Sequence, residues 1–121
     1  MIGLGIDVCH VARIEKALQK GDGFLKRYYT QDERDYLQNK KDAQSAAGMY
    51  AAKEAFLKAL GIGLSGGVAL SDVGVTHDGH GCPAYALSAK AADAMRRKGA
   101  RNSHLSISHD GGIAAAVCVL E

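Results

Sequence analysis

The sequence of 121 residues predicts an α+β domain in which a mainly antiparallel sheet packs against one long helix. Three observations support this fold class. Residues 2–8 alternate apolar and small side chains, as a half-buried strand does. Residues 43–60 carry apolar side chains at helical spacing over a length that strands rarely reach. Two pairs of strand-like segments, each joined through glycines, predict antiparallel hairpins in the second half of the chain.

Length and composition indicate a single folded domain over residues 1–121. A chain of this length buries roughly two-thirds of the surface that it exposes when unfolded, and 47% hydrophobic with 23% charged residues is typical of folded proteins. No apolar run approaches the roughly 20 residues of a membrane-spanning helix, and the first residues lack the basic flank of a signal peptide. The three cysteines form no CxxC pair, so we expect reduced thiols. We therefore expect a cytoplasmic protein that binds no membrane.

The chain begins with a strand and a helix. The strand over residues 2–8 has one face of isoleucine, leucine and valine, and a second face that carries only two glycines and Asp7. The spacing of apolar residues predicts a helix over residues 11–19. Gly21 and Gly23 are expected to end this helix, because glycine adopts left-handed conformations without strain.

Two shorter helical segments come next. Residues 24–29 predict a short helical turn. Thr30 and Glu33 then match a capping box, in which the hydroxyl and the carboxylate satisfy free backbone amides at the start of a helix that reaches about Leu37. The polar residues 39–42 predict a break before the long helix.

The long helix is predicted over residues 43–60, followed by a glycine-rich loop over residues 61–67. One stripe of its surface is apolar and is expected in the core: Met49, Ala52, Phe56, Ala59 and Leu60.

Two hairpins and a helix complete the chain. Residues 72–77 and 83–87 predict the first hairpin, and residues 104–109 and 113–120, joined by DGG, predict the second. Between them, residues 88–99 predict a helix that Ser88 caps and Gly99 ends.

Glu54 and Lys58 lie one turn apart on the side of the long helix that faces away from the apolar stripe. Only small residues surround them on this side, which leaves the helix backbone open to a ligand: Ala47, Ala51, Ala55 and Gly61. The alternative is an ordinary exposed ion pair between residues one turn apart, which stabilises a helix only slightly.

Asp7 provides a second carboxylate on a small-residue surface, since its neighbours on the same strand face are glycines. Two carboxylates, completed by water or substrate oxygens, are the usual protein ligands of Mg²⁺. A lysine beside such a site suits a phosphate. The alternative is that Asp7 caps the end of the strand.

The glycine-rich loop and the last hairpin offer further groups for a phosphate. The loop could bring backbone amides close to it, although a helix C-cap explains Gly61 equally well. Ser106 and Ser108 share one strand face, and His109 lies at the edge of the turn, so a hydroxyl and an imidazole could donate hydrogen bonds. The alternative is a hairpin with ordinary turn chemistry. A zinc site at His77, His80 and Cys82 is less favoured than a hairpin tip, because a fourth ligand is missing.

An early basic segment could bind an acidic partner. The formal net charge of +2 is too small to indicate nucleic-acid binding by itself, but basic residues crowd residues 13–27. A noncatalytic adaptor that binds an acidic protein or nucleic acid through this segment is therefore an alternative function, and a solvated helix face is the simplest interpretation. The basic residues are Arg13, Lys16, Lys20, Lys26 and Arg27.

Taken together, the motifs resemble the small bacterial holo-acyl-carrier-protein synthases, a group of 4′-phosphopantetheinyl transferases. Five motifs match in order along nearly the whole chain, which is far more specific than any one of them. They are GIDVCHVARIE for the N-terminal strand and helix, YTQDE for an aromatic-Thr-x-x-Glu segment, AAGMYAAKEAFLKALGIG for a Lys-Glu-Ala helix and glycine-rich loop, DGHGCPAYAL for a Gly-x-Pro hairpin, and HLSISHDGGIAAAVCV for a Ser-x-Ser-His hairpin.

The resemblance implies the 4′-phosphopantetheinyl transferase fold and a reaction. The 4′-phosphopantetheine group of coenzyme A moves to a serine of apo acyl carrier protein, in support of fatty acid biosynthesis, and adenosine 3′,5′-bisphosphate is released. By the family pattern, Asp7 and Glu54 hold Mg²⁺, for which Mn²⁺ could substitute, and Lys58 contacts the phosphates. The implied coenzyme-binding residues are Lys58, Gly61, Gly63, Ser108 and His109.

The resemblance also implies partners. Family members are similar in forming homotrimers with sites between protomers, so Ser108 and His109 are expected to reach coenzyme A bound by a neighbouring chain. Acyl carrier proteins are acidic, and the implied docking residues are Arg13, Lys16, Lys20 and Arg27. Two positions depart from the family pattern: His10 replaces a glutamate near the metal carboxylate, and Met49 replaces an arginine, which predicts weaker contacts to the coenzyme.

Overall fold

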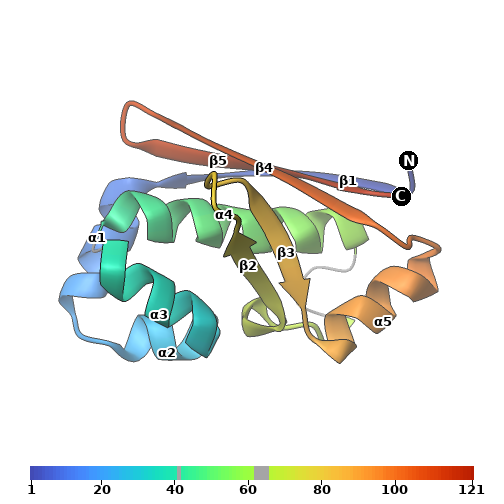
Figure 1. Ribbon diagram of the computed structural model, residues 1–121, viewed down its shortest axis with the longest axis horizontal. Coiled ribbons are helices and arrows are strands. Elements are labelled where there is room, and N and C mark those ends of the chain that lie inside the picture. Colours follow the sequence, from blue (N-terminus) through green and yellow to red (C-terminus); the bar gives the residue numbers. More distant parts are fainter. Residues whose placement is uncertain (41, 62–65) are drawn as a thin grey trace.

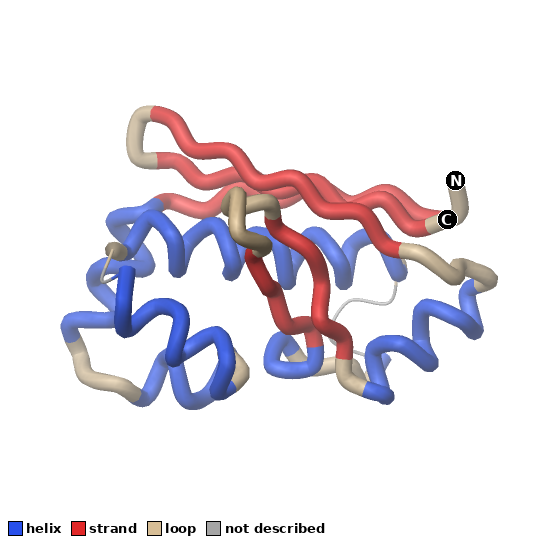
Figure 2. The backbone as a smooth tube through the Cα atoms, in the orientation of Figure 1, coloured by secondary structure: helices blue, strands red, loops and turns tan. Residues whose placement is uncertain are grey.

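An 18-residue helix, α4 (Ala43–Leu60), runs through the middle of the computed structural model, which describes residues 1–40, 42–61 and 66–121. A three-stranded antiparallel sheet in the order β1-β5-β4 lies along one side of this helix (Figure 1). A separate two-stranded ladder, β2-β3, crosses the helix on another side (Figure 2). The strands are β1 (Gly3–His10), β2 (Val73–His77), β3 (Pro83–Leu87), β4 (Ser103–Asp110) and β5 (Ile113–Leu120).

The remaining helices lie near the two ends of α4 (Figure 1). Three of them gather near its start and one lies near its end, and none of the helices in the described part of the chain is long and apolar enough to cross a membrane. The predicted α+β class is confirmed, although the sheet is divided in two. The helices are α1 (Val11–Gln19), α2 (Gly23–Tyr28), α3 (Gln31–Lys40) and α5 (Ala89–Lys98), with a short 3-10 helix at Leu70–Asp72.

Strand β1 lies directly on the backbone of α4, and its glycines make this approach possible. A Cβ atom on Gly5 would lie only 2.0 Å from the carbonyl oxygen of Ala55, and one on Gly3 would lie 2.3 Å from that of Ala59. The small-residue surfaces of strand and helix therefore pack against each other. The expectation that they leave room for a ligand is wrong along most of their length, because the partner backbone fills the space.

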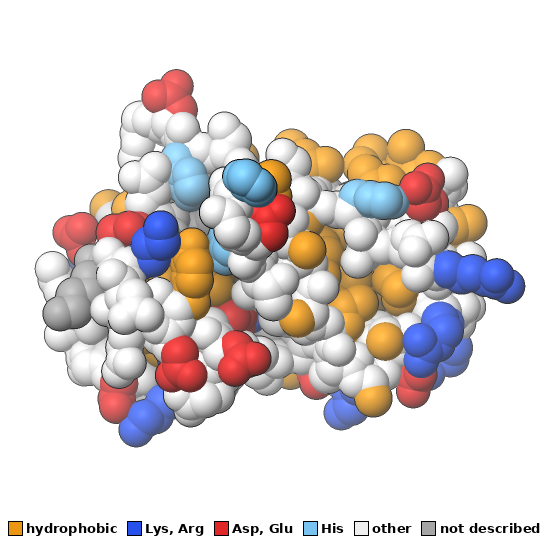
Figure 3. Space-filling model, viewed as in Figure 1, with side chains coloured by type: hydrophobic (Ala, Val, Ile, Leu, Met, Phe, Trp, Pro, Cys, Tyr) orange, Lys and Arg blue, Asp and Glu red, His pale blue; other side chains and the backbone are white. Residues whose placement is uncertain are grey.

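The apolar face of β1 points away from the helix. Ile2, Leu4, Ile6 and Val8 are between 45% and 63% exposed. Neighbouring positions of β5 continue this surface, since Leu4 pairs with Val119 and Ile6 pairs with Val117. Hydrophobic side chains are visible along the upper right edge of the molecule, over this sheet (Figure 3). The strand is half-buried as predicted, but its glycine face is the buried one.

The core lies on both sides of α4. The predicted apolar stripe is buried, with Met49 at 1% exposure, and Ala47, Ala51 and Ala55 on the opposite side are also fully buried. A helix that is apolar nearly all round lies inside its domain. Near its end α4 also reaches the surface, where Glu54 is half-buried and Lys58 is exposed.

The predicted helix caps are mostly confirmed. The Thr30 amide donates to Glu33 Oε1 at 2.8 Å, and the Glu33 amide donates to Thr30 Oγ1 at 3.1 Å, which completes the capping box. Gly61 ends α4 in a left-handed conformation, with φ of 76°. Gly23 begins α2 and does not end a helix as expected.

The last hairpin is tighter than predicted. Asp110 pairs with Ile113, so that only Gly111 and Gly112 form the turn. Their φ values of 56° and 79° match the type I′ turn, which favours glycine at both central positions. His109 therefore lies within β4 and not at the edge of the turn.

Candidate active site

Asp7 and Lys58 meet where β1 lies along the last turns of α4. Lys58 Nζ lies 2.9 Å from Asp7 Oδ1 and donates a second hydrogen bond of 3.1 Å to the carbonyl oxygen of Ile6. The Asp7 side chain is 17% exposed and that of Lys58 is 55% exposed. The lysine therefore pairs across elements with Asp7, in place of the one-turn pair with Glu54 that was the alternative from sequence.

Glu54 shares an environment with Asp7. Burial raises the pKa of the Cys9 thiol, and the charges of Asp7 and Glu54 raise it further while Arg13 lowers it. The charges of Asp7 and Glu54 thus both act on the thiol of Cys9, a buried residue of β1. Burial also raises the pKa of Tyr50, one turn before Glu54, with Glu54 adding to the shift. The predicted carboxylates are brought to one region of the surface.

The two carboxylates suit a divalent cation with oxygen ligands. Mg²⁺ is commonly held by one or two carboxylates together with water and substrate phosphates. Residues 1–40, 42–61 and 66–121 contain no cluster of three or more His, Cys, Asp and Glu side chains that could hold a metal. The fit therefore rests on Asp7 and Glu54, with substrate oxygens as the remaining ligands.

Ser108 and His109 lie on the other edge of the three-stranded sheet. Both belong to β4, which β5 separates from β1 and Asp7. With strands about 4.8 Å apart, this places them about 10 Å from β1. Within one chain, the structure does not bring these residues to the carboxylates. Gly61 does lie close to Lys58, at the end of α4, whereas Gly63 lies outside the described residues.

The predicted docking residues share the surface of α1 and α2. Arg13, Lys16, Lys20 and Arg27 are all exposed. Lys20 and Arg27 line a groove of about 480 Å³ together with aromatic side chains of α2.

An aromatic group connects this surface to the carboxylates. It consists of Phe24, Tyr28 and Tyr50; the Phe24 and Tyr50 rings stack with centroids 5.8 Å apart. The Arg13 guanidinium lies 5.4 Å from the centre of the Tyr50 ring and contacts its hydroxyl at 3.5 Å. Sequence reasoning missed Tyr50, although its spacing of four residues from Glu54 on one helix was a signal.

The two departures from the family pattern occupy different environments. His10 is exposed and lies three positions from Asp7, so that on an alternating strand it faces the other side of the sheet. Met49 is buried in the core. Neither side chain shares the surface of Asp7, Glu54 and Lys58.

An exposed lysine ammonium beside two carboxylates provides a positive charge and possible metal ligands, which are groups that phosphoryl-transfer sites use. The chain belongs to the 4′-phosphopantetheinyl transferase superfamily, whose family model matches residues 3–118. This confirms the family resemblance.

Full-length relatives and solved structures agree with this assignment. The chain is 44% identical to a holo-[acyl-carrier-protein] synthase of Geobacter sp. (strain M21), with 98% of this chain and 97% of the relative covered. It is 42% identical to one of Treponema denticola, with coverages of 100% and 98%. The synthase of Neisseria meningitidis superposes with a TM-score of 0.90 at 31% identity, covering 100% and 98% of the two chains. The synthase of Helicobacter pylori, in complex with coenzyme A, superposes with a TM-score of 0.85 at 33% identity. The match covers 98% of this chain and 99% of that one.

Proposed function

We propose that this protein transfers the 4′-phosphopantetheine group of coenzyme A to a serine of apo acyl carrier protein. The serine oxygen bonds to the phosphorus that carries pantetheine, and the bond from this phosphorus to the bridging oxygen of the pyrophosphate breaks. Adenosine 3′,5′-bisphosphate leaves, and the serine proton is released. The observation that carries the proposal is the contact of Asp7 with Lys58, in a chain that matches holo-acyl-carrier-protein synthases over its full length.

Lys58 binds the pyrophosphate in this proposal. Its ammonium is tethered by Asp7 and the Ile6 carbonyl, yet more than half of the side chain is exposed, so it remains accessible to an incoming phosphate. Asp7 keeps the lysine oriented through this ion pair. A fixed positive charge at this point stabilises the charge that develops on the leaving phosphate.

Asp7 and Glu54 would hold Mg²⁺, or Mn²⁺ in its place. When bound, the ion supplies positive charge that neutralises the pyrophosphate oxygens. The support for this assignment is the pair of carboxylates on adjoining elements, with Lys58 beside them.

The carrier protein would dock on the basic surface of α1 and α2. Arg13 is the docking residue that contacts Tyr50, and Tyr50 lies one turn before Glu54 on α4. Arg13 is therefore well placed to contact an acidic group next to the acceptor serine. Lys16, Lys20 and Arg27 extend the positive surface away from the carboxylates and would steer an acidic partner.

Three copies of the chain would assemble through the outer face of the three-stranded sheet. The exposed apolar side chains of β1 support this, since a contiguous apolar surface of this kind marks an interaction site. The position of Ser108 and His109 also supports it. Within one chain they lie on the β4 edge of the sheet, whereas Asp7 lies on the β1 edge. A neighbouring copy could bring its own β4 to the β1 edge.

The function is tested by intact mass spectrometry of an apo acyl carrier protein incubated with this protein, coenzyme A and Mg²⁺. The expected result is a mass gain of one phosphopantetheine group that EDTA abolishes. Absence of a gain with several apo carrier proteins, from a folded sample, would contradict the proposal.

A noncatalytic adaptor, the alternative function, gives no reason for Asp7 to be held by Lys58 beside Glu54. Thermal unfolding distinguishes the two functions. Coenzyme A with Mg²⁺ should raise the melting temperature of a transferase, because a ligand that binds only the folded state stabilises it. An adaptor would melt at the same temperature with and without them.

A further inference from the structure

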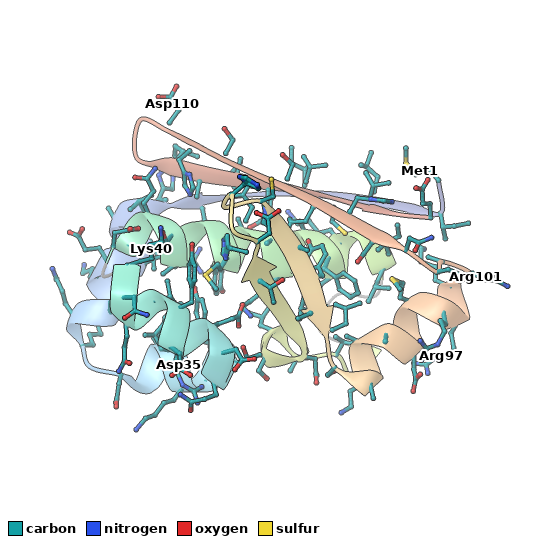
Figure 4. The ribbon with its side chains drawn as sticks, in the orientation of Figure 1. Met1, Asp35, Lys40, Arg97, Arg101 and Asp110 are labelled. Atoms are coloured by element: carbon teal, nitrogen blue, oxygen red, sulfur yellow. The ribbon has the colours of Figure 1, made fainter. Side chains whose placement is uncertain are left out.

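A groove of about 230 Å³ opens between α3, α4, the β2-β3 hairpin and β4. His109 forms one side of it, where its ring packs over α4: a Cβ on Gly48 would lie 2.9 Å from His109 Nε2. Tyr36 and His77 also line it and stack on each other, with ring centroids 4.3 Å apart and planes 4° from parallel. Histidine side chains gather on this face (Figure 3). Lys40, labelled on α3 in Figure 4, lies 5.7 Å from the centre of the Tyr36 ring.

The Tyr36–His77 stack joins two elements that do not adjoin in sequence. Burial lowers the pKa of His77, and the Lys40 charge lowers it further. Both effects disfavour the charged form of the His77 ring. Because Tyr36 belongs to α3 and His77 to β2, the stack forms only if these two elements are held in the right relative position.

A fully buried ion pair links the same elements behind the stack. Lys53 Nζ lies 2.5 Å from Glu33 Oε1 and donates to the carbonyl oxygens of Val73 at 2.9 Å and Leu70 at 3.3 Å. Glu33 Oε2 accepts a hydrogen bond of 2.9 Å from the Val75 amide. Both side chains are essentially inaccessible to solvent. Every N–H of the ammonium is used, so the pair holds α3, α4 and β2 in one arrangement.

The spacing along each element connects the ion pair to the groove. Glu33 precedes Tyr36 by one turn of α3, on the same side of the helix. Val75 precedes His77 by two positions of β2, on the same face of the strand. A shift of the ion pair would therefore move both stacked rings.

We propose that Glu33 and Lys53 are positioning residues for coenzyme binding, which act by holding the Tyr36–His77 stack in place in the groove that His109 also lines. This inference rests on the proposed function and on the contact between His109 and coenzyme A that the family resemblance implies. It gives a role to the Glu of the YTQDE motif and to the Lys of the Lys-Glu-Ala motif. Among the described residues, neither forms a hydrogen bond or ion pair with Asp7, Glu54 or Lys58.

The test measures the dissociation constant of coenzyme A, with Mg²⁺, by titration calorimetry. Glu33→Gln should raise it about three- to tenfold, in the range of coupling between residues of one network, and leave the KM for carrier protein unchanged. His77→Ala should also raise the dissociation constant of coenzyme A, because it removes one ring of the stack. In the His77→Ala background, Glu33→Gln should have no further effect, because the stack through which it acts is gone.

Controls separate positioning from loss of stability. Met95→Ala removes a buried side chain from α5, at the far end of the molecule, and should lower the melting temperature without changing coenzyme binding. If Glu33→Gln does not fold, Glu33→Gln with Lys53→Met avoids an unpaired buried charge and should show the same binding defect.

Two results would overturn the inference: wild-type affinity in the folded variants, or a full effect of Glu33→Gln without His77. Failure of the wild-type protein to bind coenzyme A would instead reject the proposed function.

Discussion

Asp7 is positioned by the packing of its strand against α4, and its carboxylate is paired with Lys58. Gly5, two residues earlier, fixes β1 against the α4 backbone, so the strand has no freedom to shift. Lys58 is anchored only at its ammonium and is largely exposed. The position of the carboxylate thus depends on backbone packing, and only its charge environment depends on the lysine. Removal of the carboxylate charge should leave the backbone unchanged.

Asp7→Asn and Glu54→Gln should each leave the protein folded and lower kcat/KM about 100-fold or more, a loss comparable to that of other groups that stabilise transition-state charge. Each removes one carboxylate charge from the proposed Mg²⁺ site. Steady-state transfer to apo carrier protein at varied Mg²⁺ measures the effect, and circular dichroism checks the fold. Asp93→Asn, which removes the partner of Arg96 on the surface of α5, is the matched control. Normal turnover of either variant at low Mg²⁺ would reject the assignment of ligands.

Gly5→Ala should destabilise the protein by about 1 to 3 kcal/mol, as overpacking of a tight core does. The added methyl group would overlap the carbonyl oxygen of Ala55, which belongs to a helix backbone and does not move cheaply. Urea unfolding measures the change. Gly79→Ala is the control, since no atom lies within 4 Å of its added Cβ and its φ is not positive. Equal stability of the two variants would mean that β1 can lift away from α4.

Among the helices, α1 and α2 carry the exposed basic residues of the proposed docking surface. Arg13→Glu should raise the KM for carrier protein far more than that for coenzyme A, because it opposes an acidic partner without touching the proposed phosphate site. The effect should weaken as ionic strength increases. Lys90→Glu makes the same charge change on an exposed position of α5 and should alter neither KM. Equal changes in the two KM values for Arg13→Glu would argue against docking.

Periodicity predicted helices and strands better than their orientation. The bounds of α1 and α4 agree with prediction, because spacing and glycine caps determine them locally. The face that β1 buries was not predictable from its own pattern. Apolar residues usually face the core, whereas here close backbone contact with an alanine-rich helix places the glycines inside. The buried pair of Glu33 and Lys53 was not predicted either, since charged residues are rarely fully buried.

The residues of the candidate site were predicted more completely than their contacts. Asp7, Glu54 and Lys58 do occupy one region, but the contact between Asp7 and Lys58 joins residues 51 positions apart. Such a contact depends on how β1 crosses α4, which no local pattern records. The placement of Ser108 and His109 on the opposite sheet edge depends on strand order, and strand order is likewise a property of the whole chain.

In the proposed trimer, each site would combine Asp7 from one copy with His109 from the next. Mixing Asp7→Asn with His109→Ala chains, after unfolding and refolding together, should therefore restore part of the activity that each variant lacks alone. Some interfaces of the mixed trimer bring an intact Asp7 to an intact His109. Mixing Asp7→Asn with Glu54→Gln should restore nothing, because both changes lie on the same side of the interface. Absence of restoration in the first mixture would place the complete site within one chain.

The two ends of the sequence lie together at one end of the three-stranded sheet, far from Asp110 at the hairpin tip (Figure 4). The Ile2 amide donates a hydrogen bond of 2.7 Å to the carbonyl oxygen of Leu120. A short linker could therefore join these ends, and new ends could be opened at the exposed tip of β2-β3. In such a circular permutant, β1 would follow β5 directly as a hairpin, and Asp7 would still cross α4 at Lys58. The spatial arrangement of the site does not require β1 to be made first.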